Sequence, residues 1–285
     1  MTPTLVRHHL PHAGPAPRVD LGARARDWSE IQERMLVPLY EAVYERLEVG
    51  SGTRLLGLGC GSGLALLMAA SRGASVTGVE RSSPERLTLA RERLQPGPWS
   101  PRAHAHTRLV HGSSRDAADA ETPAYTLVTA FEPIGCLAGD AEGLGELLAS
   151  ATPLTEHGAP VVLAGWGPPE RCATSSVLRV AARMADPLRS AGSWRPALRD
   201  DLEEVAQRAG LRPDGSGRVS CPFGYADVES AVRGLLSTGL FDAAITATDQ
   251  VQVDKELTEA LHPYQRRDGT VWMPNMFRYL IARTP

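Results

Sequence analysis

The sequence predicts an α/β fold in which a mostly parallel β-sheet carries helices on both faces. Between residues 53 and 165, short apolar runs alternate with segments whose apolar residues recur every three or four positions. Alternating strands and helices of this kind build parallel sheets, and strands buried on both faces are apolar throughout. The first of these runs also enters a glycine-rich turn, which is typical of a sheet that binds a nucleotide.

The elements before this region are an extended arm and a helix. Residues 1–26 contain four prolines and show neither a helical nor a strand period, so we expect an arm there. Residues 27–48 place apolar side chains three and four positions apart, which predicts an amphipathic helix. The alternating region then predicts strands near residues 54–58, 74–79, 107–110, 124–130 and 159–164, with helices near 63–71, 83–94 and 140–151.

Residues 166–285 complete the sheet and add helices to it. The helical patterns near 173–187 and 226–260 exceed what a minimal sheet requires, so we interpret them, with the N-terminal helix, as a cap. Strands are predicted near 216–221 and 269–283, the last two antiparallel, and helices near 173–187, 198–209 and 226–237. We expect a single domain over residues 27–285, made of an N-terminal cap helix (27–52), a cofactor-binding half (53–165) and a substrate-side half with the cap insertions (166–285).

A glycine stands at every second position of the turn that follows the first strand. Gly57, Gly59, Gly61 and Gly63 let the backbone turn sharply and let a ligand approach closely, and the following helix directs free N–H groups at that ligand. Glu80 ends the second strand, where a carboxylate can accept hydrogen bonds from both ribose hydroxyls of an adenosine. The spacing is G-x-G-x-G and differs from the G-x-G-x-x-G of dinucleotide sites, which disfavours a dinucleotide.

Residues 56–63, Leu-Gly-Leu-Gly-Cys-Gly-Ser-Gly, resemble the first motif of class I S-adenosylmethionine-dependent methyltransferases, and Gly78-Val-Glu80 resembles their second motif. Residues 125–131 and 158–165 resemble their fourth and fifth strands, and residues 275–283 resemble the last strand of the branch that methylates small molecules, including natural products. The resemblance implies a Rossmann-like sheet of seven strands with the last strand antiparallel. It also implies S-adenosyl-L-methionine as the cofactor and methyl transfer to a small-molecule acceptor.

Three positions depart from the family pattern. Gly57 replaces the acidic residue of the first motif, Ser113 replaces an aspartate that follows the third strand, and Thr126 replaces an acidic residue of the fourth strand. These changes remove expected contacts to the methionine amino group and to adenine. They keep open a methyltransferase-like protein that binds S-adenosylmethionine but catalyses another reaction or none.

The motifs and the strand ends together predict the cofactor site. We expect the methionine carboxylate near the Gly61–Gly63 turn, where the helix N-terminus favours an anion, Glu80 on the ribose, and Arg81 beside the adenine. Trp28 is expected either in the core beneath its helix or as a wall of the site. The predicted cofactor-binding residues are Trp28, Gly57, Gly59, Cys60, Gly61, Gly63, Glu80, Arg81, Ser113, Ser114 and Phe131.

The acceptor side is predicted from the ends of later strands. The candidate catalytic residues are Glu132, which follows the fourth strand, and His262, which lies in a proline-containing loop. Alternatively, Glu132 pairs with an arginine and His262 is a surface residue. The predicted substrate-binding residues are Trp166, Tyr264, Asn275 and Phe277, for which plain packing is the alternative.

The aromatic residues of the C-terminal half favour a flat acceptor. The sequence therefore predicts in-line displacement of the methyl group onto an aromatic or heteroaromatic natural product, at nitrogen, oxygen or an indole carbon. Orientation of the reactants supplies most of the catalysis, and assistance by a base is optional.

Composition argues against several other classes. The formal net charge of −3 provides no broad basic face, so a nucleic-acid substrate is not expected. No apolar run reaches the ~18 residues of a membrane span, and the cysteines have neither zinc nor disulfide spacing, so we expect reduced thiols in the cytoplasm. His104, His106 and His111 lack a suitably spaced carboxylate, so no metal site is expected. The sequence leaves a homodimer open.

A nicotinamide-dependent oxidoreductase is the second alternative. It requires the third glycine of G-x-G-x-x-G, which is absent here. It also requires a catalytic Tyr-Lys or similar pair, and Lys255, the only lysine, stands far from any such tyrosine motif. Methyl transfer therefore remains the favoured prediction.

Overall fold

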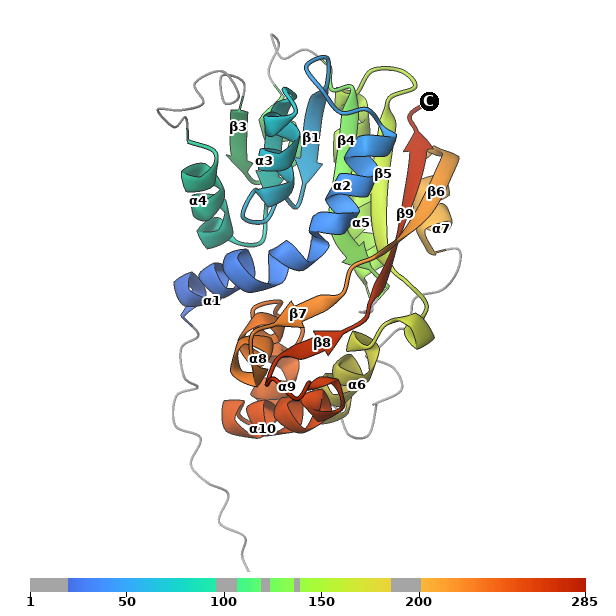
Figure 1. The fold of residues 1–285 in the computed structure, drawn as a ribbon. Coiled ribbons are helices and arrows are strands. Elements are labelled where there is room, and N and C mark those ends of the chain that lie inside the picture. Colours follow the sequence, from blue (N-terminus) through green and yellow to red (C-terminus); the bar gives the residue numbers. More distant parts are fainter. Residues whose placement is uncertain (1–19, 96–106, 119–123, 136–138, 186–200) are drawn as a thin grey trace, which may run out of the picture.

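The computed structural model of the protein describes residues 20–95, 107–118, 124–135, 139–185 and 201–285. Its centre is a seven-stranded sheet in the order β3-β2-β1-β4-β5-β9-β6 (Figure 1). Strands β1 to β5 run parallel, and β9 runs antiparallel to both of its neighbours, which confirms the predicted Rossmann-like fold class. The strands are β1 (Arg54–Leu58), β2 (Ser75–Glu80), β3 (Thr107–His111), β4 (Leu127–Ile134), β5 (Pro160–Trp166), β6 (Arg212–Ser220) and β9 (Met276–Arg283).

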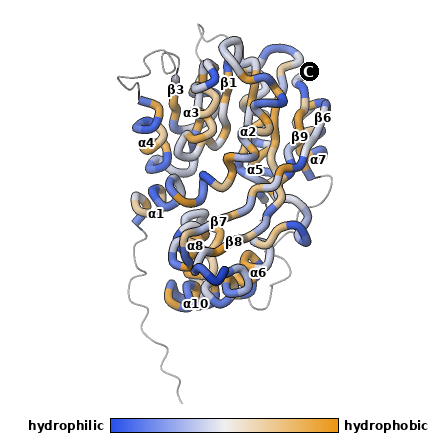
Figure 2. The backbone as a smooth tube through the Cα atoms, viewed as in Figure 1, coloured by the Kyte–Doolittle hydropathy of each residue, from blue (hydrophilic) through white to orange (hydrophobic). Residues whose placement is uncertain are grey.

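Helices cover both faces of this sheet. Leu55 of β1 belongs to a buried cluster with α2, α3 and α4, whereas its neighbour Leu56 belongs to a cluster with α5 and α7 on the other face. Figure 2 accordingly shows hydrophobic residues gathered along the strands of the large sheet. The helices are α2 (Val37–Arg46), α3 (Leu64–Ser71), α4 (Pro84–Arg93), α5 (Asp140–Ala151) and α7 (Asp201–Arg208).

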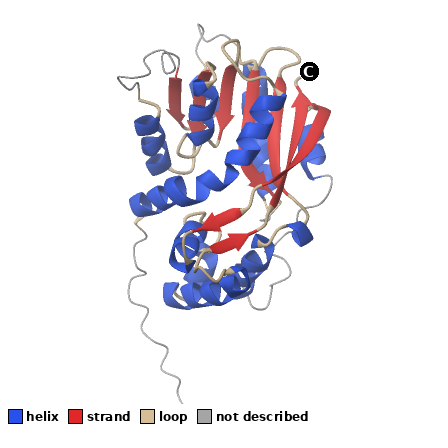
Figure 3. Cartoon of the chain, viewed as in Figure 1, coloured by secondary structure: helices blue, strands red, loops and turns tan. Residues whose placement is uncertain are grey.

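A second group of elements, which we call the cap, lies beyond the carboxyl ends of the parallel strands (Figure 1). Figure 3 shows its short two-stranded ribbon, β7 and β8, apart from the large sheet and beside the cap helices. The prediction of one continuous strand over residues 269–283 was wrong, because Pro274, which has no N–H to donate, separates β8 from β9 and the chain changes sheets there. The cap consists of α6 (Thr174–Ala185), β7 (Phe223–Tyr225), α8 (Val228–Leu236), α9 (Asp242–Ala247), α10 (Gln250–Leu261) and β8 (Val271–Met273).

The N-terminal helix is longer and less regular than the sequence predicted. α1 (Leu21–Asp27) begins inside the expected arm, where the Asp20 carboxylate accepts the Ala23 N–H at 2.9 Å and caps the helix. A π-helical turn, η1 (Trp28–Gln32), and a 3-10 turn, η2 (Glu33–Leu36), then separate α1 from α2. Pro38 stands in the first turn of α2 and has no N–H, so a regular α-helix cannot continue through this point.

Some expectations fall on residues that the structure does not describe. They concern the arm over residues 1–19, and His104 and His106. Within the described ranges, no helix combines the length and the apolar character that crossing a membrane requires.

Candidate active site

The turn between β1 and α3 forms the floor of the site. Gly59, Gly61 and Gly63 have φ angles of 61°, 56° and 80°, a left-handed conformation that glycine adopts without strain. The Cys60 N–H donates to the carbonyl of Val79 on the neighbouring strand at 3.0 Å and so holds the turn against β2. The glycine spacing found in the sequence is thus a requirement of this backbone path.

Position 57 is occupied by glycine for a different reason, which is the packing of α3 on β1. A Cβ at this position would lie 2.9 Å from Cδ2 of Leu66, and Leu66 is itself only 1% exposed. The close packing of α3 on β1 therefore leaves no room for the acidic side chain that the family pattern carries here.

Glu80 ends β2 beside the turn and is 3% exposed. Its Oε2 accepts the Gly61 N–H at 3.0 Å, and its Oε1 accepts the N–H and the hydroxyl of Ser82 at 2.8 and 2.6 Å. The carboxylate holds two loops together at the edge where β1 lies between β2 and β4, the point at which such sheets bind ligands. Glu80 also lines both cavities, and its contact with a ribose stays a prediction.

Glu33 is a buried carboxylate that the sequence analysis did not single out. Its Oε1 accepts the N–H groups of Ser62 and Leu64 at 3.2 and 3.4 Å, and its Oε2 accepts the Ser62 hydroxyl and pairs with Arg93 Nη1 at 2.6 Å. No local pattern marks Glu33, because Ser62 and Arg93 lie 29 and 60 positions away. Two of the donors at the start of α3, those of Ser62 and Leu64, therefore already have an acceptor, and a methionine carboxylate at this turn would compete with Glu33 for them.

Two adjoining cavities open over this floor. The smaller one, about 40 Å³, lies over the glycine-rich turn between Trp28 and Arg86. The larger one, about 360 Å³, extends from Glu80 to Trp166. Trp28, Glu80 and Glu132 line both cavities, so a ligand could occupy them together.

Glu132 projects from β4 at the junction of the two cavities. Its Oε2 lies 3.4 Å from the place that a Cβ on Gly59 would take, and it has no hydrogen-bond partner among the described residues. Burial by the surrounding protein raises the pKa of Glu132 above the ordinary carboxyl value, Arg86 opposes this effect, and Glu80 adds to it. Because the side chain is open to the cavity, a ligand can reach this carboxylate.

We expect Glu132→Gln to melt at a higher temperature than the wild type at about pH 8, with the advantage shrinking toward about pH 5. The raised pKa means that the folded state disfavours the charged carboxylate, so the wild type loses stability as the pH rises through the folded-state pKa. Glutamine carries no such charge. Thermal unfolding of both proteins across this pH range measures the difference between their melting temperatures. A difference that grew toward acid pH would contradict the raised pKa of Glu132.

The far end of the larger cavity is aromatic. The rings of Trp166 and Phe277 lie 4.6 Å apart, and Phe223 of β7 lies 6.0 Å from each of them. All three line the cavity, and the substrate contacts of Trp166 and Phe277 stay predictions. Phe223 was missed, because nothing in the sequence shows that the cap ribbon returns to this wall.

Several other predicted cofactor-binding residues also line the cavities. Gly57, Cys60 and Phe131 border the smaller cavity, and Arg81 borders the larger one. Gly63 lies outside both walls; a Cβ on it would lie 3.0 Å from the Cβ of Ala90, so it permits close packing of α4. Their contacts with a cofactor stay predictions.

Ser113 and Ser114 lie apart from the cavities. The Ser113 N–H and hydroxyl both donate to Asp116 in a 3-10 turn, and the Ser114 hydroxyl lies 2.6 Å from that of Ser150. Ser113 and Ser114 both belong to the described part of the chain, and neither lines the smaller or the larger cavity. Their side chains thus have structural partners, and adenine contacts from them stay predictions.

Three candidate acceptor-side residues are also distant from these walls. His262 is exposed, and the Tyr264 hydroxyl lies 3.0 Å from the Ser176 hydroxyl. Asn275 is 2% exposed, and its side-chain oxygen accepts the Thr174 N–H at 3.1 Å. These contacts join α6 to the residues that precede β8 and β9. The part of the chain that the structure describes holds no cluster of three or more His, Cys, Asp or Glu side chains suited to a metal ion.

No protein-family model matches the chain, and no curated protein sequence matches it. Solved structures do share its fold. One is a provisionally assigned methyltransferase of Bacillus halodurans C-125, with 14% identity, a TM-score of 0.53, and coverage of 86% of this chain and 98% of that one. Another is the geranyl diphosphate C-methyltransferase of Streptomyces coelicolor A3(2), solved with S-adenosyl-L-homocysteine, with 17% identity, a TM-score of 0.50, and coverage of 92% and 84%.

A third similar structure is the [4+2]-cyclase SpnF, with 14% identity, a TM-score of 0.50, and coverage of 87% of this chain and 80% of that one. At identities this low, structural likeness establishes the fold alone, and the reaction has to be argued from the residues of the site. The strand order, the antiparallel β9 and these likenesses agree. The chain therefore has the Rossmann-like fold of the class I methyltransferases.

Proposed function

We propose that this protein is an S-adenosylmethionine-dependent methyltransferase that acts on a small aromatic or heteroaromatic acceptor. One observation carries the proposal: the left-handed glycine turn and Glu80 form the floor of a cavity whose opposite end is walled by Trp166, Phe223 and Phe277. The floor suits an adenosine ligand, and the far wall suits a flat acceptor.

The residues of the floor fit this cofactor. A Cβ on Gly61 would lie 3.1 Å from Glu33 Oε1 and 3.2 Å from Trp28 Nε1, so glycine keeps open a space that any side chain would fill. Trp28 Nε1 borders that space as a buried donor without a partner among the described residues. Three carboxylates, Glu33, Glu80 and Glu132, give the smaller cavity a negative surplus that favours a cationic sulfonium.

S-Adenosylmethionine supplies an activated methyl group when it is bound. The protein would hold the acceptor against the Trp166–Phe277 wall and keep water away with the apolar side chains of that end. Glu132 stands between the two cavities, and its raised pKa makes it a stronger base than an ordinary carboxylate. It is the residue placed to take a proton from an acceptor nitrogen or oxygen.

The decisive experiment is calorimetric titration with S-adenosylmethionine and S-adenosylhomocysteine, with NAD as the control. We expect both sulfur compounds to bind and NAD to fail. Glu80→Ala should weaken binding by more than about 100-fold, because two hydrogen bonds to a charged acceptor are lost, each contributing roughly 1.5–3 kcal/mol. Glu92→Ala, an exposed carboxylate change on α4, is the matched control and should bind as the wild type does.

Glu80 also braces two loops, so the folded state of Glu80→Ala needs its own measurement. Glu80→Gln keeps an oxygen for the Ser82 donors and separates loss of ligand contact from loss of fold. Failure of both sulfur compounds to bind a folded wild-type protein would remove the proposal.

In a second candidate function, the protein binds the same cofactor at the same site but transfers no methyl group. The likeness to the cyclase SpnF supports it, together with Glu33, which accepts the Ser62 and Leu64 N–H groups where the prediction placed a methionine carboxylate. Release of S-adenosylhomocysteine in the presence of aromatic amines, phenols and indoles distinguishes the two candidates.

A further inference from the structure

Glu132 is the carboxylate at the junction of the two cavities, and its charge has no direct partner. It lines both cavities and makes neither a hydrogen bond nor an ion pair with any residue that the structure describes. Glu80, by contrast, accepts hydrogen bonds from two loops, and Glu33 pairs with Arg93. A carboxylate that loses its water to a ligand without gaining a donor costs free energy. The ligand at this junction therefore has to offer Glu132 a donor.

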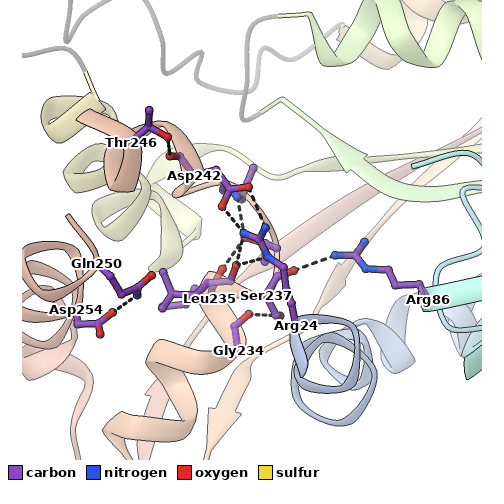
Figure 4. Close-up of polar contacts among 12 residues, drawn as sticks. Arg24, Arg86, Gly234, Leu235, Ser237, Asp242, Thr246, Gln250 and Asp254 are labelled. Atoms are coloured by element: carbon purple, nitrogen blue, oxygen red, sulfur yellow. Dashed lines mark hydrogen bonds and ion pairs between the residues drawn. The ribbon is translucent and has the colours of Figure 1, made fainter. Parts of the chain in front are cut away.

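Arg86 is a buried cation of the same region, but it is engaged with the cap. It lines the smaller cavity, where its guanidinium lies 4.0 Å from the centroid of the Trp28 ring, and it donates to the Ser237 carbonyl at 2.9 Å. Figure 4 shows Arg86 of α4 and Arg24 of α1 reaching the end of α8, where Arg24 donates at 3.1 and 3.3 Å to the carbonyl of the last residue of that helix. Arg86 thus holds the cap and acts on Glu132 only at longer range.

The larger cavity carries more negative than positive charge. Its charged side chains are Glu80, Arg81, Glu132 and Asp140. Arg81 offsets little of this excess, because its side chain is 66% exposed and lies 4.0 Å from Glu146, so that water screens its charge. S-Adenosylmethionine carries a single net positive charge and leaves part of the excess in place. An acceptor with a negative charge would be repelled here, whereas one with a positive charge would be attracted.

The aromatic wall lies within reach of a short acceptor held at Glu132. β4, β5 and β9 are neighbours in the sheet, and neighbouring strands lie about 4.8 Å apart. The backbones that carry Glu132 and Phe277 are therefore separated by roughly 10 Å across the sheet. Both side chains line the cavity between them, so a ring against Trp166 and Phe277 with an amine on a two-carbon arm can reach the carboxylate.

We propose that the acceptor is an arylalkyl amine that enters as a cation, with its ring against Trp166 and Phe277 and its ammonium group donating to Glu132. This inference rests on the proposed function and names the acceptor class of the same site. The nitrogen passes one proton to Glu132, and its lone pair forms the bond to the methyl carbon while the electron pair of the C–S bond stays on sulfur. The products are the methylated ammonium ion and the neutral thioether S-adenosylhomocysteine.

The same charges disfavour an oxygen acceptor. A phenol becomes negative when it loses its proton, and the neighbouring carboxylates Glu80 and Asp140 oppose a further negative charge. An ammonium group becomes neutral instead, and a sulfonium in the smaller cavity favours this loss because it disfavours a second positive charge nearby. Burial raises the pKa of Glu132, so the proton has a suitable acceptor.

The test compares ligands that share a ring and differ in charge. Tryptamine, tryptophol and indole-3-acetate carry a cation, a hydroxyl group and an anion, and 2-phenylethylamine, 2-phenylethanol and phenylacetate repeat the series on a smaller ring. Calorimetric titration of the protein saturated with S-adenosylhomocysteine measures their binding. We expect the amine of a series to bind about 10-fold more tightly than its alcohol, because ion pairing is added to the hydrogen bond, and the anion to bind most weakly.

Glu132→Gln should remove this preference by weakening binding of the amine about 10-fold, while binding of the alcohol changes little. Glu132→Asp keeps the charge on a shorter arm and should retain part of the preference. Glu142→Gln is the matched control, because Glu142 is exposed on α5 and lines neither the smaller nor the larger cavity. It makes the same change in net charge and should keep the wild-type preference.

Two results would overturn the assignment while the cofactor site stands. One is an amine that binds no better than its alcohol in both series, absence of binding included. The other is a preference for the amine that survives in Glu132→Gln. If S-adenosylhomocysteine itself fails to bind the folded wild type, the proposed function fails with the inference.

Discussion

We expect Gly61→Ala to abolish binding of S-adenosylhomocysteine. The new Cβ would stand 3.1 Å from Glu33 Oε1 and 3.2 Å from Trp28 Nε1, inside the space assigned to the ligand. The φ angle of 56° adds strain, since a left-handed conformation costs a non-glycine residue roughly 1–2 kcal/mol. Calorimetric titration measures the binding, and denaturant unfolding measures the strain.

Gly210→Ala is the matched control for this strain. Gly210 follows α7 with a φ of 74°, and a Cβ there would meet nothing within 4 Å. We expect Gly210→Ala to lose only the cost of the left-handed conformation and Gly61→Ala to lose at least as much free energy of unfolding, because its Cβ is also crowded, whereas only Gly61→Ala loses the ligand. Normal binding by a folded Gly61→Ala protein would show that the ligand does not lie over this turn.

Glu33→Ala should lower the free energy of unfolding by about 3–5 kcal/mol, the range found when one partner of a buried ion pair is removed. The side chains of Glu33 and Arg93 are only 3% and 18% exposed, so Arg93 would keep a charge with little access to water. The N–H groups of Ser62 and Leu64 would lose their acceptor as well. Equilibrium unfolding in urea measures the loss.

The exposed pair Glu204 and Arg208 on α7 provides the comparison. Glu204→Ala should cost no more than about 0.5 kcal/mol, as exposed pairs one helical turn apart do. The double variant Glu33→Met with Arg93→Met should lose less than Glu33→Ala alone, because no buried charge remains. A loss below about 1 kcal/mol for Glu33→Ala would mean that water reaches this pair and that the α3 N-terminus is open to ligands after all.

Much of the fold was predictable because its strands and helices have strong local patterns. β1 and α5 have the predicted bounds, residues 54–58 and 140–151, since an apolar run and a three-to-four period are each complete within a few residues. The floor was predictable for the same reason. The glycine spacing and Glu80 belong to one strand–turn–helix–strand unit whose geometry is local.

The rest of the site depends on contacts between distant segments. Glu33 reads as one polar residue of an amphipathic helix, and only the fold brings it to Ser62 and Arg93. Arg86 likewise reads as a surface arginine of α4 until α1 and α8 are placed around it. Pro38 carried the one local signal for the irregular N-terminal helix, and the apolar period obscured it.

The π-helical turn Trp28–Gln32 has a consequence for how related sequences are aligned with this one. Such a turn holds one residue more than an α-helical path needs. Deleting one residue there, such as the exposed Glu30, would restore the regular path but rotate the preceding helix by about 100° relative to Glu33. Arg24 could then not reach α8 while Glu33 stayed at α3, so a one-residue alignment gap at this place marks a protein with a differently built floor.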